Sequence, residues 1–178
     1  MNLTTEGGAG EPAACAGCGA VLPGGTAGCQ ALADERLVRE FADLGRARFH
    51  RLATDCYCLQ HPDRYCRSAK SLAAHLAGLC WALEYGGHPS GYTALNRFLD
   101  GTPALTKPEI PAARGTVTLA DVVGAADAEA YARAVDAWAR SIWAAYGPLR
   151  PVARTWIQTA LARPKGAAHR RRWSSSGG

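Results

Sequence analysis

Three cysteines near the N-terminus constrain this 178-residue chain more than any other feature. Cys15 and Cys18 form a CxxC pair, and Cys29 follows within a short glycine-rich segment. A CxxC pair can turn two thiolates onto one ion, and a third cysteine can supply another corner of a tetrahedral zinc site. Because this segment has little hydrophobic periodicity, it needs a cross-link such as a metal ion in order to fold. The sequence therefore predicts a zinc site with these three cysteines and one further ligand.

The composition favours one helical domain in a reducing compartment. Hydrophobic residues make up 48% of the chain, enough for a conventional core, and no run of eighteen apolar residues predicts a membrane span. The first residues have neither a basic start nor an apolar stretch, so we expect no secretory signal and a cytoplasmic location. Seven cysteines in that compartment indicate metal binding, core packing or catalysis before disulfides.

The charge is concentrated at the C-terminus. The net charge is +5, and four of these positive charges are Lys165, Arg170, Arg171 and Arg172. The rest of the chain is close to neutral, so we expect no nucleic-acid binding except through this basic tail. Arginine outnumbers lysine and alanine is abundant, which is typical of a GC-rich bacterial genome.

Hydrophobic periodicity predicts an all-α fold of about five to seven helices in a single bundle-like domain, with an irregular cysteine-rich N-terminal segment. We expect a flexible N-terminus over residues 1–14, the helical domain over 15–163 and a disordered basic tail over 164–178. No strand is predicted. The expected helices cover about 31–44, 47–60, 65–85, 92–99 and 151–162, with a short helix capped at Thr118 and a longer one carrying Val135, Trp138, Ile142 and Trp143.

Histidines on the second and third expected helices are candidates for the chemistry. His50, Thr54, Tyr57 and His61 lie along one side of the second helix, and Asp55 is close by. His75 lies beside the buried leucines of the third helix. If the two helices pack antiparallel, His61 and His75 converge. We expect His75 to complete the metal site and Asp55, Tyr57 and His61 to form a catalytic group, with the roles of the two histidines left open.

The four remaining cysteines are interpreted as core residues. Each lies on a helical segment where a small buried hydrophobe fits. Cys56 and Cys58 are two positions apart, so on a helix they point in nearly opposite directions and are poor ligands for one ion. The four residues are Cys56, Cys58, Cys66 and Cys80.

The chain resembles a bacterial family of unknown function, domain-of-unknown-function family 5946. The resemblance runs from Cys15 to about Leu83, with a weaker echo at Trp138–Trp143. It rests on a CxxCG, a Gly-Cys, a His-Arg-Leu, an Asp-x-Tyr-x-x-Gln-His-Pro and a Ser-x-x-x-His-Leu, which here are Cys15–Gly19, Gly28–Cys29, His50–Leu52, Asp55–Pro62 and Ser71–Leu76. The resemblance implies a zinc-like site and a polar His/Asp/Tyr/Gln cluster, but no reaction. Cys56 and Cys58 stand where small apolar residues are usual.

Two functions of different classes fit these observations. One is a small zinc enzyme with a His/Asp/Tyr pocket that acts on a small molecule, in which a zinc-bound water drives hydrolysis or hydration. The other is a non-catalytic zinc-stapled module, such as a regulator, that binds a protein partner or a small ligand; three cysteine ligands favour this structural kind of site. A third reading, similar to DinB-like bundles, places a separate metal on His50, His61 and His75. The sequence has no GxGxxG, P-loop, GxSxG or HExxH motif to support other enzyme classes.

Overall fold

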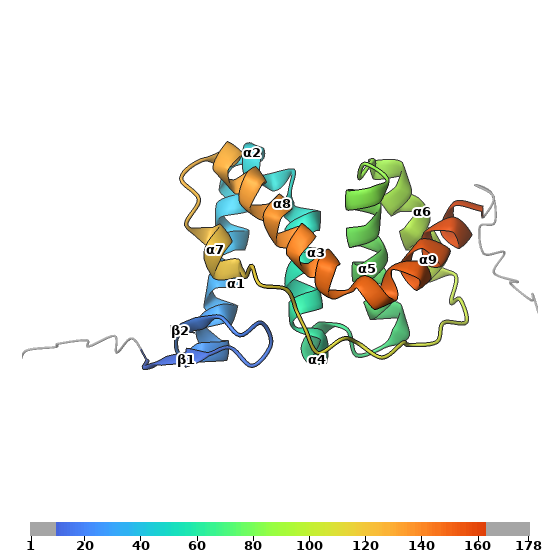
Figure 1. The fold of residues 1–178 in the computed structure, drawn as a ribbon. Coiled ribbons are helices and arrows are strands. Elements are labelled where there is room, and N and C mark those ends of the chain that lie inside the picture. The colour runs from blue at the N-terminus through green and yellow to red at the C-terminus, as the bar shows by residue number, and fades with distance from the viewer. Residues whose placement is uncertain (1–9, 163–178) are drawn as a thin grey trace, which may run out of the picture.

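A computed structural model describes residues 10–162 of the chain. These residues form a short two-stranded sheet, nine α-helices and one turn of 3-10 helix (Figure 1). In chain order the elements are β1 (Pro12–Ala14), β2 (Val21–Pro23), α1 (Gly25–Ala42), α2 (Leu44–Ala47), α3 (His50–Gln60), α4 (Pro62–Tyr65), α5 (Ala69–Glu84), α6 (Pro89–Asp100), α7 (Leu119–Val123), α8 (Ala128–Ala145), η1 (Gly147–Leu149) and α9 (Arg150–Ala162).

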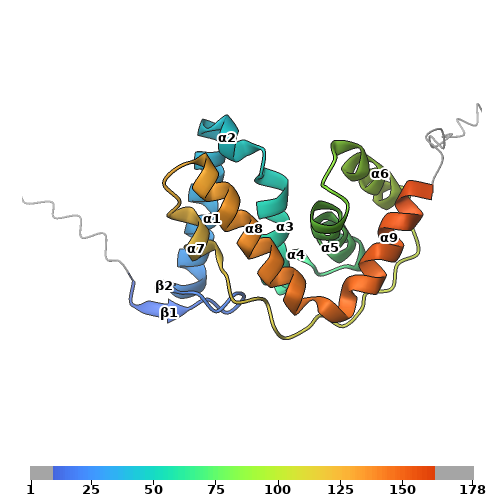
Figure 2. The ribbon, with the colours of Figure 1, turned by 45° about the horizontal axis from the view of Figure 1, so that its top comes forward.

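Helix α3 lies in the middle of the molecule. The hairpin, α1, α2 and α7 lie on one side of it, and α5, α6 and α9 lie on the other (Figures 1 and 2). Helix α8 runs across both halves, because it packs on α2, α3 and α5. Side chains on α3 can therefore meet residues from both the N-terminal and the C-terminal part of the chain.

The mostly helical fold confirms the expectation in its coarse form, but the structure is not purely α-helical and has more helices than expected. The expected helix over 47–60 begins only at His50, as α3; a turn at Arg48 and Phe49 separates it from the one-turn helix α2, which follows α1. The expected helix over 65–85 begins only at Ala69, because Ser68 and Ser71 form a capping box there. The preceding residues form the separate one-turn helix α4, which starts with Pro62.

The sequence predicted no strand, and the N-terminal hairpin shows that this prediction was wrong. Residues 12–14 pair antiparallel with residues 21–23, with Ala13 opposite Leu22. The turn between the strands carries the CxxC pair, and α1 follows two residues after β2. Cys29, which was expected to precede the first helix, lies inside α1 because that helix begins at Gly25.

The buried face of α1 also differs from the expected one. Val38 and Phe41, which recur at helical spacing in the sequence, are largely exposed. Cys29, Ala33, Arg36 and Glu40 are buried instead. The polar Arg36 and Glu40 replace apolar residues on this face because their side chains bond to each other (Nη1–Oε1 2.8 Å). A hydrophobic-periodicity argument cannot recognise such a face, since charged residues occupy its core positions.

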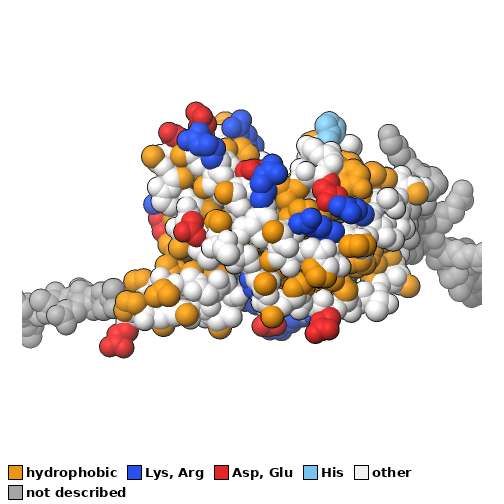
Figure 3. Space-filling model, viewed as in Figure 1, with side chains coloured by type: hydrophobic (Ala, Val, Ile, Leu, Met, Phe, Trp, Pro, Cys, Tyr) orange, Lys and Arg blue, Asp and Glu red, His pale blue; other side chains and the backbone are white. Residues whose placement is uncertain are grey.

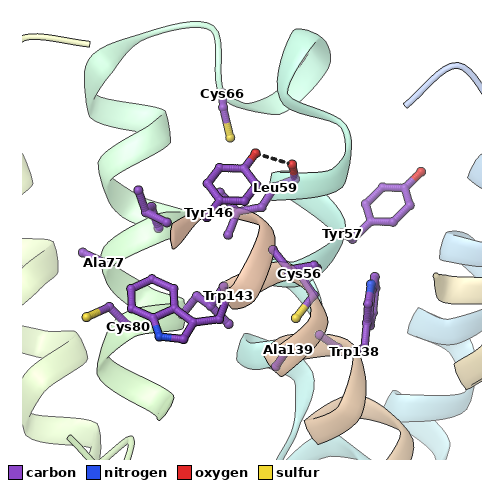
Figure 4. Close-up of a cluster of buried hydrophobic side chains, with 14 of the residues drawn as sticks. Cys56, Tyr57, Leu59, Cys66, Ala77, Cys80, Trp138, Ala139, Trp143 and Tyr146 are labelled. Carbon is purple, nitrogen blue, oxygen red and sulfur yellow. Dashed lines mark hydrogen bonds between the residues drawn. The ribbon is translucent and has the colours of Figure 1, made fainter. Parts of the chain in front are cut away.

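The main core lies where α3, α5 and α8 meet (Figure 4). Leu72, Leu76 and Leu79 of α5 are fully buried, as expected from their spacing. Two polar groups bind across this core: the Tyr146 hydroxyl donates to the Leu59 carbonyl at 2.6 Å, and the Trp138 Nε1–H donates to Gln60 Oε1 at 2.8 Å. Both bonds fix the C-terminal end of α3 against α8 and the residues after it.

The described surface carries mixed charge. In Figure 3 acidic and basic side chains are interspersed with hydrophobic ones on one face of the molecule. None of the helices between residues 10 and 162 is long and apolar enough to cross a membrane. The expected flexible N-terminus covers residues 1–14, and within it Pro12–Ala14 form β1. Residues 1–9 and the basic tail lie outside the described range.

Candidate metal centre

Four buried side chains meet between the hairpin, α1 and the end of α3. They are Cys15, Cys18, Cys29 and His61, and their sulfur and nitrogen ligand atoms all lie within 4.8 Å of one another. His61 Nε2 is 3.4 Å from the sulfurs of both Cys15 and Cys29, and the sulfurs of Cys18 and Cys29 are 3.7 Å apart. These separations are those of donors around one central ion, and we call the four residues the Cys3His cluster.

The hairpin turn aims the first two thiols. The Cys15 amide donates to the Ala20 carbonyl, and the Gly19 amide donates to the Cys15 carbonyl, both at 2.8 Å. Gly19 has a φ of 78°, a left-handed conformation that favours glycine. Between the two cysteines, a Cβ on Gly17 would lie 2.3 Å from the His61 ring. The turn therefore needs glycine for its own backbone and for the close approach of the imidazole.

His61 lies at the junction of α3 and α4, where Pro62 starts a new helix. Its Nδ1 bonds to the Tyr57 carbonyl at 2.7 Å, and the Tyr57 ring packs on the imidazole at 4.2 Å between centroids. A carbonyl acceptor makes Nδ1 the protonated nitrogen and leaves the Nε2 lone pair for a metal. The Tyr57 carbonyl therefore provides the acceptor that orients a histidine metal ligand through its other ring nitrogen.

The thiols and the imidazole influence one another's ionisation. The hydrogen bond with Cys29 lowers the pKa of the Cys18 thiol to about 4 and raises that of Cys29. Burial opposes ionisation of Cys15, but the backbone N–H groups of Cys18 and Gly17 and the His61 ring lower its pKa. Burial also acts against the charged form of His61, yet the contacts with Cys18 and the Tyr57 carbonyl raise its pKa. The cluster thus favours thiolates at Cys15 and Cys18 beside the imidazole, and a bound cation would take the place of the proton that remains on Cys29.

Of the two candidate histidines, His61 and not His75 lies beside the three cysteines. His75 Nδ1 instead bonds to Asp55 Oδ1 at 2.9 Å. Asp55 is fully buried and also accepts from Arg51 Nε at 2.8 Å. The expected catalytic group is therefore divided: Tyr57 and His61 lie at the Cys3His cluster, and Asp55 lies with His75 between α3 and α5.

His50 belongs to neither group. Its Nδ1 bonds to Glu40 Oε2 at 2.8 Å, and Glu40 also binds Arg36 and the Tyr131 hydroxyl. The metal set formed by His50, His61 and His75 is thus not brought together: the one group of potential ligands that converges in the described part of the chain is the Cys3His cluster. Arg36, Glu40 and Tyr131 were not predicted as a group, because Tyr131 lies on α8 and no local sequence signal joins it to α1.

A pocket of about 150 Å³ lies against the cluster. Ala16 and Gly17 of the CxxC turn and Thr26 of α1 form one wall, and residues of α3 and α4 form the other, namely Tyr57, His61, Asp63 and Arg64. One of these lining residues is held by α1, because Gln30 Oε1 accepts from Arg64 Nη1 at 2.7 Å. The pocket thus combines two exposed charged residues, Asp63 and Arg64, with the buried rings of Tyr57 and His61.

The fold and the cluster define a mostly helical protein with a Cys3His site that could hold a metal ion. The chain belongs to DUF5946, a family of unknown function, whose model matches residues 13–147. The match covers the hairpin, the Cys3His cluster and most of the helices, and it confirms the family that the sequence motifs indicated. Comparisons with curated proteins and with solved structures find no match.

Proposed function

We propose that this protein is a zinc-stapled helical binding module in which zinc on the Cys3His cluster is structural. The observation that carries the proposal is the convergence of four buried sulfur and nitrogen donors from the hairpin, α1 and the end of α3. Zinc would link the hairpin turn, α1 and the end of α3 through one ion. We expect the ion to hold the N-terminal hairpin against the helical body.

The donor set supports zinc as the ion. Thiolate and imidazole ligands suit a borderline-soft cation, and three cysteines with one histidine are a common set for structural zinc. Hard cations such as magnesium and calcium prefer oxygen ligands, which this cluster lacks. Zinc binding would also explain why so many thiols and one histidine lie together away from solvent.

The coordination number supports a structural role. Four protein ligands complete a tetrahedral site, whereas catalytic zinc keeps a position for water or substrate. A metal-bound water would need one of the four to be absent or displaced. For this reason we favour the non-catalytic hypothesis over zinc-centred hydrolysis.

The pocket beside the cluster supports small-ligand binding as the role of the module. Arg64 and Asp63 give its rim both signs of charge, and Tyr57 provides an aromatic surface. A ligand there would contact Gly17 and the His61 ring, so its binding would depend on the metal-held position of the hairpin. We propose a small polar molecule as the ligand and the zinc site as the support for one wall of its pocket.

The proposal is tested by elemental analysis of protein purified without added metal. We expect one zinc per chain in the natural protein and in His75→Gln, and loss of zinc in Cys18→Ser and in His61→Gln. Cys80→Ala is the matched control, because it removes a buried thiol outside the Cys3His cluster. Metal retained by both Cys18→Ser and His61→Gln, or absent from the natural protein, would refute the zinc site.

A further inference from the structure

A short loop over residues 114–117 is anchored to the helical core by a buried glutamine. The loop belongs to the long connection between α6 and α7, which runs along the lower edge of the molecule in Figures 1 and 2. Gln60, a fully buried residue of α3, donates through Nε2 to the carbonyls of Arg114 at 3.0 Å and Val117 at 2.8 Å. Because its Oε1 accepts from Trp138 Nε1 of α8, this amide ties the loop to two helices.

Ser141 of α8 holds the same loop by its backbone amides. Its Oγ accepts from the N–H of Thr116 at 2.7 Å and from that of Val117 at 3.1 Å. Gly115 allows this approach, because its φ is 90° and a Cβ there would lie 2.8 Å from Ser141 Oγ. Gln60 and Ser141 thus fix the carbonyls and the amides of one loop, and neither of them is a ligand in the Cys3His cluster.

The bonds at Ser141 determine which hydroxyl proton remains for a ligand. A hydroxyl group has one proton and two lone pairs. The two amides occupy both lone pairs of Ser141 Oγ, so Ser141 is the donor in its 3.3 Å contact with Thr116 Oγ1. No other hydrogen bond joins the Thr116 hydroxyl to a residue within the described range. Its own proton is therefore available to a ligand.

A pocket of about 360 Å³ lies between this loop and the last turn of α8. Arg114 and Thr116 line it from the loop, and Ser141, Ala144 and Ala145 line it from the helix. Its volume falls within the usual range for small-molecule sites. A ligand there would meet a loop whose backbone is already held in place, so little ordering would oppose its binding.

Arg114 brings an uncompensated positive charge to this pocket. The residue is half-buried, and its guanidinium forms no ion pair with any residue between 10 and 162. Its one hydrogen bond in that range is a long contact of 3.4 Å from Nη1 to the Ala113 carbonyl. The residues that line the pocket include no carboxylate, so the charge is available to an anionic ligand.

The lining residues favour a carboxylate among small anions. A guanidinium presents parallel N–H groups that match the two oxygens of a carboxylate. Arg114 is the one cation among the residues that line the pocket, which suits a monoanion better than a phosphate dianion. The methyl groups of Ala144 and Ala145 form an apolar wall suited to a short aliphatic chain.

We propose that this pocket binds a small aliphatic carboxylate, whose carboxylate group is held by the Arg114 guanidinium and the Thr116 hydroxyl. Gln60 and Ser141 contribute through the loop that they anchor. The site shares no residue with the Cys3His cluster or with the pocket beside that cluster. It therefore does not depend on zinc or on the ligand proposed for the other pocket.

The test is titration of the isotope-labelled full chain with sodium butyrate, followed by two-dimensional amide NMR. We expect saturable shifts of the Gly115 and Thr116 amides, with a dissociation constant on the order of 1 mM, as is reasonable for a ligand of so few atoms. Butyramide has nearly the same shape without the charge and should cause no saturable shift. Inorganic phosphate should bind more weakly than butyrate.

Arg114→Gln should weaken butyrate binding by about 10-fold or more, the usual effect of losing a hydrogen bond to a charged group. The substitution keeps the backbone carbonyl that Gln60 holds, so the loop retains its anchors. Arg140→Gln is the matched control and should bind butyrate normally. It removes an exposed arginine of α8 that pairs with Asp136 and does not line the pocket.

Thr116→Val tests the second donor, because it removes the hydroxyl and keeps the amide that Ser141 holds. We expect butyrate binding to weaken by about 5-fold, as for loss of a single hydrogen bond. Unchanged binding in Arg114→Gln or in Thr116→Val would overturn the proposal. So would equal binding of butyramide, tighter binding of phosphate, or the absence of saturable shifts at the Gly115 and Thr116 amides.

Discussion

The imidazole of His61 is held by the residue one helical turn before it, because its Nδ1 bonds to the Tyr57 carbonyl at 2.7 Å and its ring packs on the Tyr57 ring. This relationship predicts that the ring of Tyr57, but not its hydroxyl, supports metal binding. The hydroxyl donates to Gln30 Oε1 at a long 3.4 Å. Tyr57→Phe should leave zinc affinity unchanged, and Tyr57→Ala should lower it by about 10-fold, at the low end of outer-sphere effects. Competition with a chromogenic chelator measures both; equal affinity in the two variants would contradict this role of the ring.

Metal removal should destabilise the hairpin before the helices. The Cys3His cluster joins the hairpin turn, α1 and the end of α3, whereas α3, α5 and α8 also pack directly on one another. With a strong chelator we expect a lower melting temperature and only a small loss of helical circular dichroism, because metal-binding free energy stabilises the segments that the ion joins. Added zinc should restore the original value. Identical melting with and without chelator would contradict the prediction.

The pH dependence of stability should change when His75 is replaced. Burial alone would lower the pKa of His75, but the contacts with Asp55 and Cys58 raise it from 6.5 to about 9. The charged ring therefore stabilises the fold fully below pH 6.5, and this contribution is lost as the pH rises towards 9. The difference in unfolding free energy between the natural protein and His75→Gln should be on the order of 2 kcal/mol larger at pH 6 than at pH 9.5.

Urea unfolding at the two pH values measures this change. The same substitution in His88 is a useful control, because His88 is an exposed cap residue that bonds to Ser90. A constant difference for His75→Gln across the range would contradict the raised pKa.

Two glutamates on α1 should differ strongly in their contribution to stability. Glu40 is 2% exposed and binds Arg36, His50 and Tyr131, whereas Glu35 is 44% exposed and pairs only with Arg39. Glu40→Ala should cost about 3–5 kcal/mol, because it leaves a buried guanidinium without its partner. Glu35→Ala should cost about 0.5 kcal/mol, as is usual for an exposed pair. Similar unfolding midpoints for the two variants would refute the buried role of Glu40.

Gly78 should be essential for the contact between α3 and α5. A Cβ at this position would lie 2.3 Å from Asp55 Oδ2 and 2.9 Å from Arg51 Nη2. Gly78→Ala would force the Arg51–Asp55 pair apart, and we expect a loss of about 1–3 kcal/mol, the usual cost of overpacking. Gly124→Ala is the control, because nothing lies within 4 Å of a Cβ there. A more stable Gly78→Ala variant would show that helix propensity outweighs the clash.

The sequence was sufficient to locate the three cysteines of the Cys3His cluster and most helices. CxxC spacing and a later cysteine are local signals, and the leucines of α5 recur at the helical period in the sequence itself. The capping box at Thr118 and Asp121 was likewise readable and is present. These features depend on residues that are close together in the chain.

The choice between His61 and His75 depended on information that is not local. His61 reaches the cysteines because α3 ends there and Pro62 redirects the chain. Hydrophobic periodicity also could not predict the buried face of α1, because Arg36 and Glu40 lie on it. Arg36 and Glu40 became acceptable core residues only through Tyr131 and His50, which lie on other helices. Both the histidine at the Cys3His cluster and the buried face of α1 thus depend on contacts between residues far apart in the sequence.

The Cys3His cluster joins the hairpin to a histidine 46 positions further along the chain. With zinc as the joining ion, the attachment of the hairpin becomes a function of free metal concentration. Each tenfold rise above the dissociation constant adds about 1.4 kcal/mol to the attached form. Since Gly17 and His61 both line the neighbouring pocket, metal scarcity would open one wall of that pocket while the helices persist. Ligand occupancy would then follow the zinc supply of the cell.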